Sequence, residues 1–465
     1  MSNIKDSRRK MLGDDPVEKV VVKLAVPAII GMLVTAIYNI VDTIFVGQLG
    51  QEALGAATVA LPIFTFISAI GLMYGIGSSS YISRLLGANK KEEAEKTLTT
   101  SLVLTIVTAF SFSILSLLFL ERILVIFGAS DAILPLAKEY TQVLIIGGIA
   151  TMINMNLNNT LRAEGSAKIS MIALSTGALL NIVLDPLLIF TFDMGIKGAA
   201  IATVLSQVIS TVILLTYYIR SKSLLELDLG KASLDPTIVK EIYIMGTPAL
   251  LRQSLISLSM GFWTKAASNY GISAVAALGI ITRVYMFGLY ILLGYTQGFL
   301  PVAGFNFGSK QYDRLLLAIK VTLKNTAIFC ITLTIVYIGF AESLSKLFVN
   351  EPEVIEIATK GIRYFSILMP FLGFIMTFNN LFQAIGYATI AMILSIARQG
   401  VFLIPAILLL PKRYGLEGVL LSQTIADALT LVTTIFFAVY IIRKIKKMKS
   451  NYANDLSSEV VEIAS

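Results

Sequence analysis

Two aspartates lie inside long apolar stretches of the sequence, where a charged side chain is costly. Asp42 follows Tyr38 and Asn39 by four and three residues, so the three side chains share one face of a helix. Asp185 follows Asn181 by four residues, which places an amide one helical turn from a second carboxylate. Carboxylate and amide oxygens can hold a proton or a hard cation such as Na⁺. The two segments therefore predict a site for a small cation.

Further polar groups are expected at the same depth. Pro186 removes the helical hydrogen bond to the carbonyl of Ile182, which leaves an oxygen near Asp185. A polar stripe follows one face of another predicted helix, at Thr151, Asn154 and Asn158. We expect this stripe, together with Tyr38 and Asn39, to line a substrate cavity.

A structural role is the alternative for these polar residues. Asn and Thr side chains often form hydrogen bonds between membrane helices, and each Asn and Thr named above fits that role equally well. Asp42 and Asp185 fit it poorly, because a carboxylate at the centre of a bilayer costs at least ~2.5 kcal/mol. A neutral residue would make the same packing contacts at lower cost.

The amino-acid composition indicates whether these segments lie in lipid or in water. The chain has 465 residues, of which 56% are hydrophobic and 14% charged, against about 25% charged in soluble domains. It has no histidine and a single cysteine, Cys330, which excludes Ser-His-Asp catalysis, His-zinc sites and disulfides. No P-loop, HExxH or Gly-x-Ser-x-Gly pattern is present. We therefore expect an all-α polytopic membrane protein that is not an enzyme.

Twelve apolar runs are long enough to cross a bilayer, which takes about 20 residues. They lie at 20–46, 54–82, 97–120, 133–161, 168–192, 196–219, 237–267, 274–304, 315–340, 358–385, 388–411 and 416–441. They divide the chain into an N-terminal segment (1–19), an N-lobe (20–219), a linker (220–236), a C-lobe (237–441) and a tail (442–465). The end of the tail is polar and acidic, and we expect it to be disordered.

The basic residues predict the orientation. Most of the 37 Lys and Arg residues fall in the segment before the first run, in alternate loops and at the start of the tail. This distribution places both termini in the cytoplasm of a plasma-membrane protein. It also explains the net charge of +8 without nucleic-acid binding.

The two halves repeat each other. An offset of 221 residues pairs Pro27 with Pro248, Gly50 with Gly271, Gly87 with Gly308 and Gly165 with Gly386. Each half contains six predicted spans, so the halves are expected to be parallel repeats related by a pseudo-two-fold axis along the membrane normal. This architecture places a cavity between two bundles and permits alternating access. A duplicated scaffold without transport is the alternative.

The polar residues do not follow this repeat. At the same offset Asp42 falls on Trp263 and Asp185 falls on Ala406. The apolar runs of the second half contain instead Arg252, Arg283, Arg363 and Arg398, with Asp427 as the one acid well inside a run. We expect Arg398, near the end of its run, to snorkel toward the membrane surface, and the sequence assigns no role to Arg252, Arg283 or Asp427. Cation coupling is thus predicted in the first half.

Several short motifs together resemble the MATE family, the multidrug and toxic compound extrusion transporters. They are Val-Asp-Thr-Ile-Phe-Val-Gly (41–47), Ser-Arg-Leu-Leu-Gly-Ala (83–88), Leu-Arg-Ala-Glu-Gly (161–165), Asn-Ile-Val-Leu-Asp-Pro (181–186) and Gly-Ala-Ala-Ile-Ala-Thr (198–203). The resemblance covers residues 15–445. It implies a fold of twelve helices in two six-helix lobes.

The resemblance also implies a site and a mechanism. The N-lobe cation site of archaeal and many bacterial members carries over to Asp42, Asn181, Asp185 and Thr203, which would be metal ligands if the ion is Na⁺. Some relatives use acids in the C-lobe, but Gln253 and the pair Asn379/Asn380 occupy those neighbourhoods here. The implied activity is antiport by a monomer, in which H⁺ or Na⁺ enters and a cationic or amphipathic drug leaves, with no further cofactor.

Other transporters remain alternatives. A flippase for lipid-linked oligosaccharide precursors has the same fold, and Arg252 and Arg283 would suit a pyrophosphate. A major-facilitator transporter also has twelve spans, but the loop at 83–96 lacks the Gly/Asp/Arg signature expected there. A membrane-embedded enzyme and a channel are weaker alternatives. The sequence leaves the coupling ion, the substrate range and the oligomeric state open.

Overall fold

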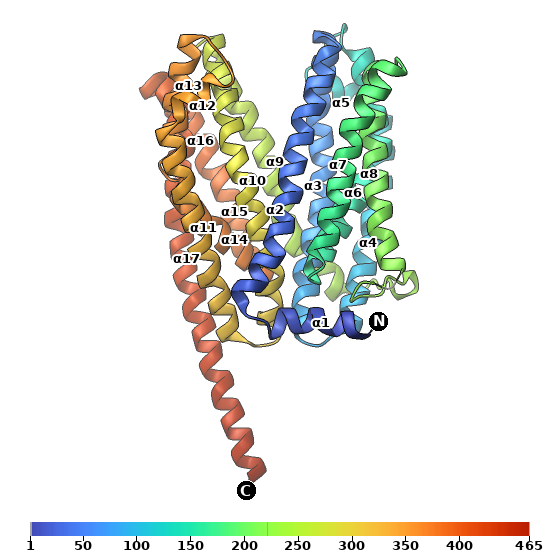
Figure 1. Ribbon diagram of the computed structural model, residues 1–465, viewed down its shortest axis with the longest axis vertical. Helices are drawn as coiled ribbons and strands as arrows, with labels where there is room; N and C mark the ends of the chain where they lie inside the picture. Colours follow the sequence, from blue (N-terminus) through green and yellow to red (C-terminus); the bar gives the residue numbers. More distant parts are fainter. Residues whose placement is uncertain (1, 221, 465) are drawn as a thin grey trace.

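The computed structural model consists of helices arranged in two lobes (Figure 1). It describes the backbone of residues 2–220 and 222–464 and the side chains of residues 8–220 and 222–454. Within these ranges all regular structure is helical. Both termini lie at one end of the bundle, which we call the proximal end, and the opposite end is the distal end (Figure 1).

The N-lobe follows a short first helix, α1 (Ser2–Gly13). Its elements are α2 (Val17–Gln48), α3 (Gln51–Gly87), α4 (Lys91–Leu118), α5 (Leu120–Ile126), α6 (Leu134–Ala163), α7 (Ala167–Pro186), the π-helical turn η1 (Leu187–Thr191) and α8 (Gly195–Ile219). A mostly non-helical segment with one 3₁₀ turn, η2 (Leu229–Lys231), leads to the second lobe. Asp235 caps the next helix by accepting a hydrogen bond from the Thr237 amide.

The C-lobe contains more breaks than the N-lobe. Its elements are α9 (Pro236–Ser268), α10 (Ile272–Gly308), α11 (Tyr312–Gly339), α12 (Ala341–Lys346), α13 (Pro352–Ser366), α14 (Met369–Ala384), α15 (Ala388–Ile396), the π-helical η3 (Ala397–Leu403), α16 (Ile404–Leu409) and α17 (Pro411–Ala464). Each lobe has its own cluster of buried apolar side chains, and a further cluster joins them near the proximal end.

The helices match the twelve predicted spans. Among the described residues, nine helical spans are long and apolar enough to cross a membrane, and the bent pair α13–α14 makes a tenth. The two others, α6 and α9, have 30 and 33 residues but carry more polar side chains. These two helices contribute several of those polar side chains to the central cavity described below.

One predicted span is sharply bent among the described helices. The run at 358–385 is divided between α13 and α14, which meet at an angle of 50°. Pro370 lies in the first turn of α14, where it lacks the amide hydrogen that would continue a helix from α13. Proline therefore explains the bend within this predicted span.

The backbone reproduces the internal repeat. Residues with positive φ occur in matched pairs: Gly50 (105°) and Gly271 (100°), Asn89 (63°) and Lys310 (58°), Gly165 (84°) and Gly386 (88°), Gly195 (54°) and Gly415 (57°). The last pair is one residue out of phase with the others. Equivalent turns thus have the same conformation in both lobes, as expected of a duplicated six-helix unit.

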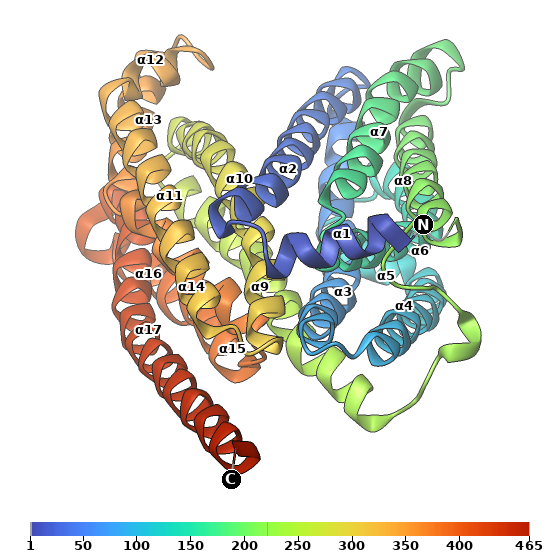
Figure 2. The ribbon, with the colours of Figure 1, turned by 60° about the horizontal axis from the view of Figure 1, so that its bottom comes forward.

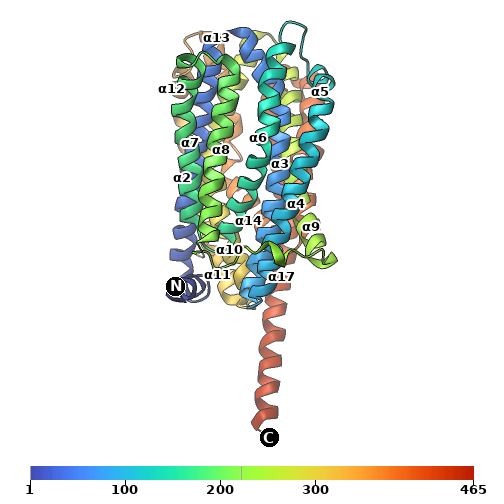
Figure 3. The same cartoon turned by 90° about the vertical axis from the view of Figure 1, so that its right-hand side faces the viewer.

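The segments near both termini are helical. Helix α1 lies across the proximal end of the bundle (Figure 2). Helix α17 continues beyond the bundle to Ala464 (Figure 3), so the disorder expected for the tail was wrong. The tail contains no Gly or Pro after Gly418 that would end the helix, and Lys449 forms an ion pair of 2.6 Å with Asp313 of α11.

The lobes contact each other through α2–α10, α3–α9 and α3–α10. Glycines allow the backbones to touch: a β-carbon on Gly77 would lie 2.1 Å from the carbonyl oxygen of Ile242, and one on Gly246 would lie 2.1 Å from that of Met73. The lobes converge at the proximal end and diverge toward the distal end (Figure 1).

Candidate functional site

The two intramembrane aspartates of the N-lobe lie next to each other. Helix α2 carries Asp42 and packs against α7, which carries Asp185. The side chain of Asp185 is fully buried, and its carboxyl group neighbours that of Asp42. Two residues 143 positions apart in the sequence are therefore brought together by the packing of two helices.

Asn181 connects the aspartate pair to α8. Its amide nitrogen donates to Oδ1 of Asp185 at 3.2 Å and lies 3.4 Å from the hydroxyl oxygen of Thr203, which accepts a second hydrogen bond. The structure thus collects Asp42, Asn181, Asp185 and Thr203 into one cluster. The sequence itself marks the first three, but only the family resemblance marked Thr203.

Three oxygens of this cluster lack a partner. Oδ1 of Asp42, Oδ1 of Asn181 and Oδ2 of Asp185 are buried, and no donor within the described residues reaches them. Buried acceptors without a donor are costly, and two adjacent carboxylates repel each other unless one is neutralised. A proton would turn one carboxyl into a donor, and Na⁺ would be bound by oxygens alone. The residues present fit either ion.

The helix that carries Asp185 does not end regularly. After Pro186 the chain continues as the π-helical turn η1, which leads to the turn before α8. A π-helical turn changes the hydrogen-bond pairing of the backbone and often occurs at functional sites. Here it directly follows the carboxylate of the cluster.

A cavity of about 380 Å³ lies between the lobes, next to the aspartate cluster. Both lobes supply its wall, with Tyr38, Asn158, Asn181 and Thr203 among the N-lobe residues and Gln253, Trp263, Asn379 and Asn380 among those of the C-lobe. Asn181 and Thr203 belong to both the cluster and the wall. Neither Asp42 nor Asp185 lines the cavity.

The predicted cavity residues occupy three different environments. Tyr38 and Asn158 line the cavity. Thr151 and Asn154 are buried outside the lining, where Asn154 donates to the hydroxyl of Thr211 at 3.4 Å and accepts a hydrogen bond from Asn158. Asn39 is exposed and lies outside the wall. The polar stripe of α6 thus serves packing at one end and the cavity at the other.

A buried ion pair of the C-lobe was not anticipated. Nε of Arg398 lies 2.8 Å from Oδ1 of Asp427, and the same guanidinium donates to the hydroxyl of Tyr285 at 3.0 Å. The expectation that Arg398 snorkels to the surface was wrong, because η3 points this side chain at the cavity and Asp427 neutralises it. The signal in the sequence was the single acid, Asp427, among four arginines in the spans of one lobe.

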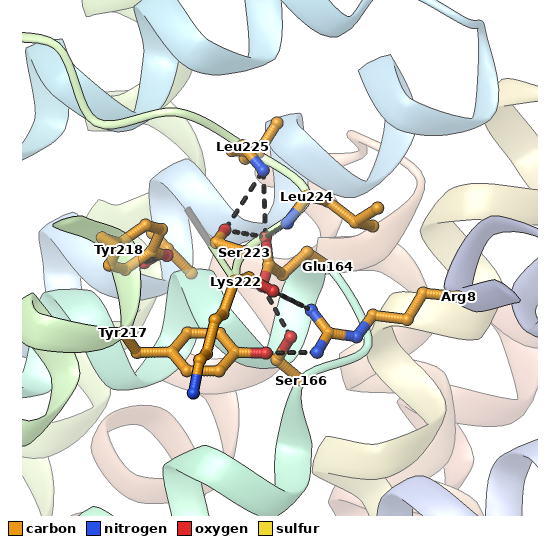
Figure 4. A network of polar contacts seen from close by, with 10 residues as sticks. Arg8, Glu164, Ser166, Tyr217, Tyr218, Lys222, Ser223, Leu224 and Leu225 are labelled. Carbon is orange, nitrogen blue, oxygen red and sulfur yellow. Dashed lines mark hydrogen bonds and ion pairs between the residues drawn. The ribbon is translucent and has the colours of Figure 1, made fainter. Parts of the chain in front are cut away.

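A further buried carboxylate, that of Glu164, lies in a network of polar contacts that includes α1 (Figure 4). Glu164 follows α6 and accepts hydrogen bonds from the hydroxyl of Ser166 and from the backbone amides of Leu224 (3.0 Å) and Leu225 (3.3 Å). Arg8 of α1 lies 3.6 Å from the same carboxylate. Burial raises the pKa of Glu164, although these donors act in the opposite direction. This network ties α1 and the segment between the lobes to the N-lobe.

Comparison with known proteins identifies the family and supports the two-lobe fold. The MatE family model matches the chain twice, at residues 27–187 and 248–408, with the same 221-residue offset as the internal repeat. The multidrug export protein MepA of Staphylococcus aureus is 29% identical over 443 residues, which are 95% of this chain and 97% of MepA. MepA of Staphylococcus haemolyticus is 30% identical over 444 residues, with the same coverage.

Solved structures agree closely with the fold. An outward-facing multidrug resistance MATE family transporter of the MOP superfamily superposes with a TM-score of 0.90 at 29% identity, over 94% of this chain and 98% of the other. A MOP superfamily transporter from Pyrococcus furiosus, whose binding pocket is described as reversed in polarity, gives 0.89 at 28% identity with the same coverage.

Proposed function

The chain belongs to the MATE family, and we propose that it is a secondary active transporter that exports drug-like, cationic or amphipathic organic compounds in exchange for H⁺ or Na⁺. It is a multi-pass membrane protein, and its relatives are multidrug exporters rather than enzymes. The distribution of Lys and Arg supports a cytoplasmic proximal end.

One observation carries the proposal. Asn181 and Thr203 are part of the aspartate cluster and also part of the cavity wall. A cation bound by Asp42 and Asp185 would supply the charge that the three unpartnered oxygens lack, and would change the hydrogen bonds of these two shared residues. Ion binding and substrate binding therefore act on the same side chains, which is the physical requirement for coupling.

The arrangement of the lobes supports a direction for the cycle. With the proximal end closed, Asp42 and Asp185 take up a cation from outside while the substrate leaves the cavity. Rocking of the two repeats then opens the proximal end, where the cation is released and new substrate binds. The driving force is the ion gradient, and the repeat provides two equivalent halves for the motion.

A flippase for lipid-linked oligosaccharide precursors is the second candidate. Its support is Arg252, which lines the cavity and could bind a phosphate. Arg283, the other arginine considered for this role, is exposed and lies outside the wall. Only one of the two arginines considered for this role therefore lies in the cavity wall.

Proteoliposomes loaded with ethidium, a cationic dye, or dansylglycine, an anionic dye, test the proposal. Dye movement is followed under a H⁺ gradient and under a Na⁺ gradient for wild type, Asp42→Asn and Asp185→Asn. Asp193→Asn is a matched control, because Asp193 is an exposed aspartate of the same lobe. We expect one gradient to drive transport in wild type and the control, with both cluster variants inactive. Normal transport by the cluster variants would contradict the proposal.

A further inference from the structure

The cavity wall is positively charged. Among the described residues that line it, the charged ones are Arg162, Arg252 and Arg398, and none is Asp or Glu. This polarity is unexpected for a cavity that receives only cationic compounds, because a cation would be repelled by the wall.

Two of the three arginines already have an ion-pair or hydrogen-bond partner. Arg398 is neutralised by Asp427 at 2.8 Å. Arg162 donates to Oδ1 of Asn159 at 2.8 Å and lies 3.4 Å from the hydroxyl of Ser170. The guanidinium of Arg252 has no hydrogen-bond or ion-pair partner in the part of the chain that the structure describes. Arg252 is thus the charge of the wall that is free to bind a ligand.

Helix α9 presents Arg252 together with an apolar surface. Arg252, Ile256, Met260 and Trp263 follow one another at intervals of three or four residues, and all four line the cavity. Trp263 stacks on Phe365 with ring centroids 5.0 Å apart, which fixes an aromatic wall about 16 Å along the helix from Arg252. One face therefore combines a cationic end with an aromatic end.

The aspartates of the cluster do not cancel this charge at the wall. Asp185 is fully buried behind Asn181, and Asp42 lies outside the lining. Their unpartnered oxygens require a proton or a cation, which further reduces the negative charge near the cavity. The side of the cavity formed by α9 is positive in either case.

We propose that the cavity binds amphipathic molecules that carry one anionic group, a carboxylate, sulfonate or phosphate, with that group at Arg252 and the apolar body between Arg252 and Trp263. This rests on the proposed function in that the cavity is taken as the substrate site. A guanidinium offers two parallel N–H groups to such an anion. A charge in a cavity of low polarity is stabilised most by a partner of opposite sign, and a transported anion supplies it.

Trp263 allows ligand binding in the cavity to be measured by fluorescence, because it is the only tryptophan of the chain. Dansylglycine and dansylcadaverine carry the same fluorophore with opposite charge, and both accept excitation energy from a nearby tryptophan. Titration of the full-length protein in phosphatidylcholine nanodiscs, without any ion gradient, gives their affinities. Trp263→Phe must abolish the signal if it arises in the cavity.

We expect wild type to bind dansylglycine at least about tenfold more tightly than dansylcadaverine, the effect of one charge-assisted contact. Arg252→Gln should remove this preference and leave dansylcadaverine binding intact, which also shows that the variant is folded. Arg252→Lys keeps the charge and should retain part of the preference. Arg283→Gln, at an exposed arginine of α10, is the matched control and should behave as wild type.

A third probe identifies the source of the anion. Dansyl-phosphatidylethanolamine carries its charge on a lipid phosphate, and Arg252-dependent binding of this probe would indicate lipid substrates, whereas dansylglycine alone would indicate free organic anions. Either result supports the proposal. Tighter binding of the cationic dye to wild type, or unchanged dansylglycine binding by Arg252→Gln, would overturn it. Because the titration measures binding without an ion gradient, its outcome does not depend on whether the protein is an antiporter.

Discussion

Gly87 of α3 and Gly308 of α10 each contact the backbone of the other's helix in the same way. A β-carbon on Gly87 would lie 2.0 Å from the carbonyl oxygen of Phe305, and a β-carbon on Gly308 would lie 2.0 Å from that of Arg84. All four positions are related by the 221-residue offset of the repeat. The pseudo-two-fold axis therefore passes through this crossing, where the two lobes close the proximal end.

Alanine at Gly308 should open this crossing. The added methyl group cannot occupy the space of a carbonyl oxygen, so the lobes must separate at the proximal end, at a cost of about 1–3 kcal/mol. In a Cys330→Ser background, a cysteine introduced by Ser80→Cys reports the opening, because Ser80 is buried and its hydroxyl donates to the carbonyl of Gln383 in the other lobe.

We expect Gly308→Ala to raise maleimide labelling of this cysteine from the proximal side about tenfold or more. Gly261→Ala is the control, because a β-carbon there meets only open space. Equal labelling with and without Gly308→Ala would show that the crossing does not control access.

Removal of the Thr203 hydroxyl should weaken cation binding without abolishing transport. Thr203→Val takes away the acceptor that holds the Asn181 amide, at a cost of about 1 kcal/mol. The concentration of the coupling ion for half-maximal transport should therefore rise several-fold, while the maximal rate changes less. Thr211→Val on the same helix is the control, since Thr211 contacts Asn154 rather than the cluster. An unchanged ion dependence would remove Thr203 from the site.

The ion pair of the C-lobe should be important for stability rather than coupling. Asp427→Asn leaves Arg398 buried without its counter-charge and should lower the free energy of unfolding by about 3 kcal/mol. Adding Arg398→Met should recover most of that loss, because the remaining groups are neutral. Thermal unfolding in detergent measures both. Full stability of Asp427→Asn alone would contradict this assignment.

Glu164 should make stability depend on pH. Because burial raises the pKa of this carboxyl above its ordinary value, the protonated form is favoured in the folded state. Its contribution is fully present below the ordinary glutamate pKa and is lost as the pH rises through the raised value. Glu164→Gln should therefore flatten the pH profile of the melting temperature in this range. The same slope in wild type and variant would show that another group titrates.

The sequence predicts most of the fold because the bilayer imposes a length on every helix. The spans, the repeat and the segments around Asp42 and Asp185 all follow from local patterns. The meeting of these aspartates from α2 and α7 does not, since it depends on how two helices pack. The pairing of Arg398 with Asp427 is missed for the same reason.

Other features depend on individual contacts that sequence patterns do not encode. The course of α1 across the proximal end depends on single contacts, such as that of Arg8 with Glu164. The guanidinium of Arg252 stands out because it lacks a hydrogen-bond or ion-pair partner among the described residues, which no motif encodes. Thr203 carries no signal of its own, because a threonine in an apolar helix usually serves packing.

Antiport requires that each ligand can drive the other, and this reciprocity is the most direct test of the account. Proteoliposomes with equal H⁺ and Na⁺ on both sides receive a gradient of ethidium or dansylglycine alone, and ion movement is recorded with a pH-sensitive and a Na⁺-sensitive dye. We predict movement of one ion against the direction of the organic compound in wild type and none in Asp185→Asn. Transport of the compound without any ion movement, or undiminished ion movement in Asp185→Asn, would contradict coupling at the aspartate cluster.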